Sequence, residues 1–154
     1  MQTVPPPAPI SRGALWAGRA MSGVAILFLA FDGAIKLVPI GPVTETLTQL
    51  GYAASPGLAR GLGGLTLACT LLYAWPRTAP LGAVLLTGYL GGAIATHLRA
   101  GSPVFSHLLF GLYLGLLVWG GLALRDARLR ALLRPGRSSG GSWGSGATRG
   151  SRQP

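Results

Sequence analysis

AMSGVAILFLAFDGAIKLV is the sequence of residues 20–38, and its only charged side chains are Asp32 and Lys36. A run of this length approaches the ~20 residues that a helix needs to cross a ~30 Å hydrocarbon core. It lies within the first of four apolar stretches, which are Ala14 to Val38, Gly57 to Trp75, Ala79 to Leu98 and Val104 to Leu124. The pattern therefore predicts an integral membrane protein in contact with the lipid bilayer.

The composition agrees with this prediction. The chain has 154 residues, of which 49% are apolar and only 10% are charged, too few charges for an ordinary soluble domain. Its net charge of +10 could indicate a nucleic-acid partner, but the arginines lie outside or at the ends of the apolar stretches, so we expect no nucleic acid. The single cysteine, Cys69, excludes an internal disulfide or a Cys-x-x-Cys redox pair.

Short connections determine the expected topology. Pro76 and Pro80 bracket one turn, and Gly101 and Pro103 mark the next. Because short connections force neighbouring helices to run antiparallel, the sequence predicts an all-α membrane protein, a four-helix transmembrane bundle running up, down, up, down.

Three segments are not expected to cross the membrane. Residues 1–12 form a proline-rich leader and residues 135–154 a Gly/Ser/Arg tail, both expected to be disordered, which leaves 13–134 as the transmembrane domain. Between Pro39 and Pro56, apolar residues recur every three to four positions, which predicts a short amphipathic helix at the interface that ends at Gly51.

The basic residues predict the orientation. One side of the threaded bundle carries Lys36, Arg60 and Arg99. The tails and the middle turn carry more basic residues, namely Arg12, Arg19, Arg77, Arg125, Arg128, Arg130, Arg134 and Arg137. By the positive-inside rule, both termini are expected in the cytoplasm.

The ionisable residues of the apolar stretches gather on the opposite, outer side in this threading. Asp32 and Lys36 are spaced to neutralise one another across one helical turn, although the pair could also contact a ligand or a neighbouring helix. His97 and His107 could converge on a metal or shuttle protons, but they lack carboxylate or thiolate companions, so no metal site is predicted. Five aromatic residues are expected to be ordinary belt or core residues: Trp16, Trp75, Tyr89, Tyr113 and Trp119.

Glycine is frequent, with 25 in the chain, and recurs at four-residue spacing within the apolar stretches. Small residues let membrane helices approach closely, so these glycines are expected to form packing faces, which could also recruit a second copy or another protein. The pairs are Gly57 and Gly61, Gly88 and Gly92, and Gly111 and Gly115.

Three runs together resemble the DoxX-like family of small bacterial membrane proteins: ILFLAFDGAIKL at 26–37, QLGY at 49–52, and TGYLGGAIATH at 87–97 with Arg99 after it. The resemblance covers about residues 20–133. It implies a four-helix protein of the bacterial inner membrane, some of whose wider relatives are subunits of quinone-linked oxidoreductases or partners in redox-stress complexes. It implies no defined reaction and no catalytic residues.

Two functions remain open from the sequence. The leading interpretation is an accessory or scaffold subunit of a redox-associated membrane complex. The alternative is a quinone-interacting oxidoreductase subunit, since a quinone is the cofactor that donors near the interface would suit. The candidate binding residues are Asp32, Lys36, His97, Arg99 and His107. A proton-coupled transporter is disfavoured, because the sequence shows neither an internal repeat nor polar residues at the midplane.

Overall fold

The computed structural model describes residues 11–38, 40–53, 55–103, 109–127, 129 and 130, and every regular element in this part is a helix. The helices are α1 (Arg12–Leu37), α2 (Gly41–Gln49), α3 (Pro56–Ala74), α4 (Ala79–Arg99) and α5 (Leu109–Arg125). The bounds of the first three long helices lie within about two residues of those predicted. The proline-rich leader up to residue 10, the start of the fourth stretch at residues 104–108 and the Gly/Ser/Arg tail lie outside the described residues.

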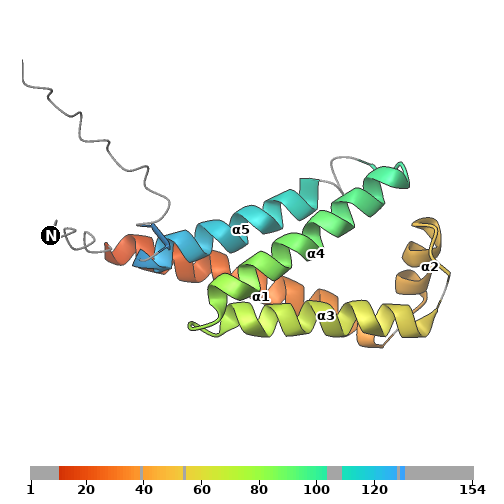
Figure 1. Cartoon of the computed structure of the whole chain (residues 1–154), viewed down its shortest axis with the longest axis horizontal. Helices are drawn as coiled ribbons and strands as arrows, with labels where there is room; N and C mark the ends of the chain where they lie inside the picture. Colours follow the sequence, from red (N-terminus) through yellow and green to blue (C-terminus); the bar gives the residue numbers. More distant parts are fainter. Residues whose placement is uncertain (1–10, 39, 54, 104–108, 128, 131–154) are drawn as a thin grey trace, which may run out of the picture.

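The four long helices pack side by side in a closed ring. α1 packs against α3 and α5, and α4 packs against the same two helices. In Figure 1, successive long helices run in opposite directions and α2 lies across the end of α3. In the described residues, α1, α3 and α4 are long and apolar enough to cross a membrane, and the described part of α5 is a shorter apolar helix.

The helix ends follow from local sequence. The backbone N–H of Ala14 donates to Ser11 Oγ at 3.3 Å and so caps α1. Gly51 and Gly101, with φ of +79° and +68°, adopt the left-handed conformation that closes α2 and α4. The predicted short helix after α1, and its end at Gly51, are therefore confirmed. Its position at the membrane interface stays a prediction.

A buried tyrosine joins three helices at the end of the molecule away from α2. Tyr73 of α3 is completely buried, and its hydroxyl donates to the carbonyl oxygen of Val118 in α5 at 2.8 Å. Since the single hydroxyl proton of Tyr73 goes to Val118, Tyr73 Oη can only accept from Ser22, whose hydroxyl in α1 donates to it at 2.9 Å. In a membrane no water replaces such bonds, so they stabilise the packing of α1, α3 and α5.

Most of the glycines at the close contacts between helices are not the ones predicted from the four-residue spacing. Of the six, only Gly111 lies against another helix, with Ile94 Cγ1 2.8 Å from where its Cβ would be. Gly61, Gly88, Gly92 and Gly115 face open space. The prediction of packing faces within the chain was therefore wrong for most of these positions, because helix rotation, and not spacing alone, decides which face meets a neighbour. Seven glycines would place a Cβ within 3.0 Å of another helix: Gly18, Gly33, Gly63, Gly82, Gly111, Gly120 and Gly121.

Candidate functional site

A cavity of about 580 Å³ lies between α1, α2, α3 and α4 at the α2 end of the molecule. Its walls are mainly apolar, with residues such as Ile35, Val43, Leu47 and Leu62. Polar side chains interrupt this lining at seven positions, namely Asp32, Lys36, Thr46, Tyr52, Tyr89, Thr96 and His97. The cavity therefore offers an apolar volume with hydrogen-bonding groups on part of its wall.

Glycines on one face of α4 help to create this space, because they have no side chain to fill it. Gly88 and Gly92 line the cavity, and a Cβ added at either glycine would meet no atom within 4 Å. Ala93 also lines it and contributes only a methyl group. The two glycines that the sequence predicted as a packing face therefore border a cavity inside the chain.

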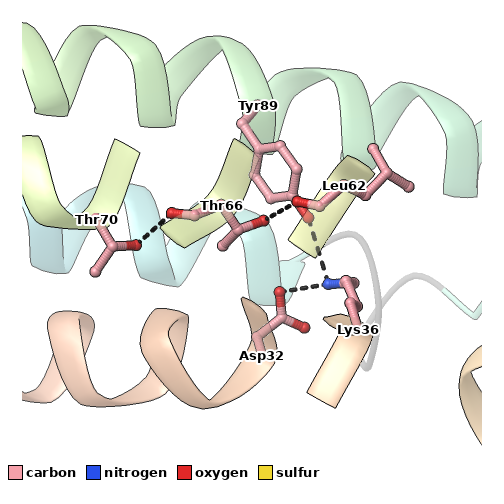
Figure 2. A network of polar contacts seen from close by, with 6 residues as sticks. All are labelled: Asp32, Lys36, Leu62, Thr66, Thr70 and Tyr89. Carbon is pink, nitrogen blue, oxygen red and sulfur yellow. Dashed lines mark hydrogen bonds and ion pairs between the residues drawn. The ribbon is translucent and has the colours of Figure 1, made fainter. Parts of the chain in front are cut away.

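Asp32, Lys36 and Tyr89 converge on one wall of the cavity (Figure 2). Lys36 Nζ forms an ion pair with Asp32 Oδ2 one helical turn away, and it donates a hydrogen bond to Tyr89 Oη of α4 at 3.3 Å. The Lys36 and Asp32 side chains are 20% and 29% exposed. The predicted pairing of Asp32 with Lys36 is confirmed.

This triad, Asp32, Lys36 and Tyr89, retains unused hydrogen-bonding capacity. Among the described residues, no side chain or backbone group pairs with Asp32 Oδ1 or accepts the hydroxyl proton of Tyr89. An ammonium group carries three N–H donors, and Lys36 uses two of them here. A ligand in the cavity could thus meet an acceptor and two donors at one place.

The threonines beside the triad in Figure 2 are already satisfied. Thr66 Oγ1 donates to the Leu62 carbonyl at 2.8 Å, and Thr70 Oγ1 donates to the Thr66 carbonyl at 2.7 Å. Such bonds to the preceding turn of the same helix are typical of hydroxyls inside apolar helices. These two residues support α3 and do not extend the site.

The other predicted site residues are placed differently. His97 lines the cavity, and its Nδ1 hydrogen-bonds Ser102 Oγ at 3.0 Å. Arg99 does not line the cavity, and its Nη2 donates to the Leu50 carbonyl oxygen at 2.7 Å. His107 lies outside the described residues. A binding role for these three residues stays a prediction.

Two tyrosines belong to the site although the sequence did not indicate a role for them. Tyr89 is expected from the sequence to be an ordinary belt or core aromatic, yet its hydroxyl accepts a hydrogen bond from Lys36. Tyr52 Oη lies 3.4 Å from Thr96 Oγ1, and since Thr96 donates to the Gly92 carbonyl, Tyr52 is the donor to Thr96. The available signal was the α4 pattern of small and polar residues at 88, 89, 92, 93, 96 and 97, which repeats on one helical face.

No three His, Cys, Asp or Glu side chains within the described ranges lie close enough together to hold a metal ion. The chemistry of the cavity would be hydrogen bonding and charge at the triad, with apolar contact elsewhere.

Comparison with known proteins identifies the family. A family model described as the DoxX-like family matches residues 20–121, from α1 into α5. The chain belongs to the DoxX-like family. The family predicted from the three sequence runs is thereby confirmed, and all the residues that line the cavity fall within the match. No curated protein and no solved structure matches the chain. With three membrane-capable helices in its described part, this DoxX-like protein is a multi-pass membrane protein.

Proposed function

We propose that this DoxX-like protein is a membrane subunit that binds a small lipophilic ligand of the quinone class in the cavity between α1 and α4. The observation that carries the proposal is the position of Asp32, Lys36 and Tyr89, which place unused donors and an acceptor in the wall of a mainly apolar cavity. A ligand with a polar ring and an apolar body matches this cavity, because the ring could bind the triad and the body could contact the apolar lining.

The dimensions support a small molecule. Ligand pockets in proteins commonly enclose about 300–1,000 Å³, and this cavity of about 580 Å³ falls within that range. A quinone ring carries carbonyl oxygens that only accept hydrogen bonds, so it needs donors. Lys36 and Tyr89 provide two such donors side by side, with Lys36 Nζ and Tyr89 Oη 3.3 Å apart.

In the proposed setting, four helices cross the bacterial inner membrane in an up-down-up-down bundle with both termini in the cytoplasm. The described basic residues support this orientation: Arg12, Arg19, Arg77 and Arg125 lie near the helix ends away from α2. The cavity would then open near the outer interface. A ligand could exchange there with the bilayer or with a partner of a redox-associated complex.

A second candidate, the accessory or scaffold subunit, is favoured by a different observation. Gly61, Gly64 and Gly91 are exposed on α3 and α4, and a Cβ at each would meet no atom within 4 Å. Exposed small residues permit close packing of membrane helices from a second copy or another subunit. Under this hypothesis, the triad serves to anchor α1 to α4, and the protein functions without a ligand in the cavity.

Substitutions at two adjacent glycines of α4, which point in different directions around the helix, separate the candidates. Gly92→Leu adds a side chain at a position that lines the cavity and where a Cβ meets no atom within 4 Å, whereas Gly91→Leu adds the same volume at an exposed position that does not line the cavity. We expect Gly92→Leu to lower the affinity for a short-tailed benzoquinone, measured in nanodiscs, by more than about tenfold, and Gly91→Leu to leave it unchanged.

The scaffold hypothesis predicts that the exposed glycines, and not Gly92, are sensitive to substitution. Gly91→Leu or Gly61→Leu would then abolish co-purification of a partner or of a tagged second copy, while Gly92→Leu would have no ligand to displace. Absence of quinone from gently purified protein, together with no saturable binding of added quinone, would refute the ligand proposal.

A further inference from the structure

One short segment, residues 40–52 with α2 at its centre, covers the cavity. α2 and the residues after it contribute Pro42, Val43, Thr46, Leu47 and Leu50 to the lining. Among the long helices, α2 packs chiefly against α3. The segment thus closes a space that also borders α1 and α4, although its own helix packing is limited.

A backbone motif at the end of α2 exposes one carbonyl for an outside donor. The N–H of Gly51 donates to the Thr48 carbonyl at 2.9 Å, and the N–H of Tyr52 donates to the Leu47 carbonyl at 2.9 Å. This is the Schellman arrangement, which satisfies those two carbonyls and leaves that of the capping residue, Leu50, open.

Arg99 of α4 occupies this open position. Its Nη2 donates to the Leu50 carbonyl at 2.7 Å, a short, charge-assisted hydrogen bond. A Cβ at Gly51 would lie 3.4 Å from the same nitrogen, so the glycine also leaves room for the guanidinium. The last turn of α4 is thereby joined to the last turn of α2, across the cavity.

A second, weaker contact acts beside it. Tyr52 donates to Thr96 Oγ1 at 3.4 Å, again from the covering segment to α4. Both contacts are exposed, and neither belongs to an apolar interface. Within the described ranges, two polar bonds therefore hold the cover to α4, the helix that carries Tyr89 of the triad.

We propose that Arg99 is a positioning residue that latches residues 40–52 over the cavity, so that release of its bond to Leu50 lets α2 move away and opens the cavity. The latch determines how fast a molecule enters or leaves. The inference rests on the proposed function only for the identity of that molecule, because the cover and its two contacts are independent of any ligand.

Cysteine accessibility tests the latch without a ligand. Leu47 of α2 lines the cavity and is 6% exposed, so Leu47→Cys in a Cys69→Ala background reports the opening of the cover to a maleimide in nanodiscs. We expect Arg99→Gln to raise the labelling rate by about tenfold, the factor that corresponds to losing one charge-assisted hydrogen bond at an exposed position. Arg60→Gln is the matched control, since Arg60 is an exposed arginine near the start of α3.

A second variant keeps the test valid if Arg99→Gln does not assemble. Tyr52→Phe removes the other contact without a change of charge, and we expect a smaller rise in the labelling rate. Equal rates for the Arg99→Gln, Tyr52→Phe and Arg60→Gln proteins would overturn the latch. Faster labelling in a protein that binds no quinone would support the latch and eliminate the proposed ligand, so the two failures are distinguishable.

Discussion

Removing one member of the ion pair between Asp32 and Lys36 should destabilise the protein more than removing both. Asp32→Ala leaves the Lys36 ammonium in the wall of the cavity with only Tyr89 as a partner. Insertion scales assign about 2.5–3.5 kcal/mol to an unpaired lysine at the centre of a membrane helix, and less toward its end. Because the two side chains remain 20% and 29% exposed, we expect a loss of about 2 kcal/mol, or roughly 30-fold in the ratio of folded to unfolded protein.

The double variant gives the decisive comparison. With Lys36→Ala added, no unpaired charge remains, and the free energy of unfolding should recover to within about 1 kcal/mol of the parent. Tyr89→Phe serves as a control that removes one hydrogen bond and no charge, with an expected cost of about 1 kcal/mol.

The assay is a titration from mild detergent into sodium dodecyl sulfate, followed by tryptophan fluorescence, on all four members of the double-mutant cycle. Additive losses in the double variant would show that the two residues stabilise the protein independently. An Asp32→Ala protein as stable as the parent would refute the reasoning altogether, and would leave ligand binding as the reason for a carboxylate at this position.

Two further predictions concern packing and orientation. Gly82→Ala should destabilise the fold by at least about 2 kcal/mol, because its Cβ would lie 2.2 Å from the backbone nitrogen of Tyr73, whereas Gly91→Ala, at an open helical position, should be neutral or slightly stabilising in the same titration. Reporter fusions at Gly141 should read cytoplasmic and fusions at Gly101 extracytoplasmic, since basic residues concentrate near the tails and the middle turn; a cytoplasmic signal at Gly101 would reverse the orientation.

Features that depend on one helix could be predicted from the sequence. Hydropathy and proline positions give the bounds of α1, α3 and α4, and the four-residue spacing of Asp32 and Lys36 gives their ion pair. Both follow from distances along a single helix, which are fixed at 1.5 Å and 100° per residue.

Features that depend on how helices rotate against one another could not be predicted. Tyr89 reaches Lys36 only because α4 presents its glycine-bearing face to the cavity, and Arg99 reaches Leu50 only because α2 ends opposite the last turn of α4. The four-residue glycine spacing gave a wrong prediction of the helix packing faces for the same reason. It identifies a helix face of small residues without saying whether that face meets a helix, a cavity or lipid.

The buried hydroxyl of Tyr73 makes the two ends of the bundle differ in how their helices are joined. It joins α1, α3 and α5 at a point where lipid offers no substitute hydrogen bond. The two ends of the bundle therefore differ in what joins their helices: buried hydrogen bonds of Tyr73 at one end, and the exposed hydrogen bond from Arg99 to Leu50 at the other.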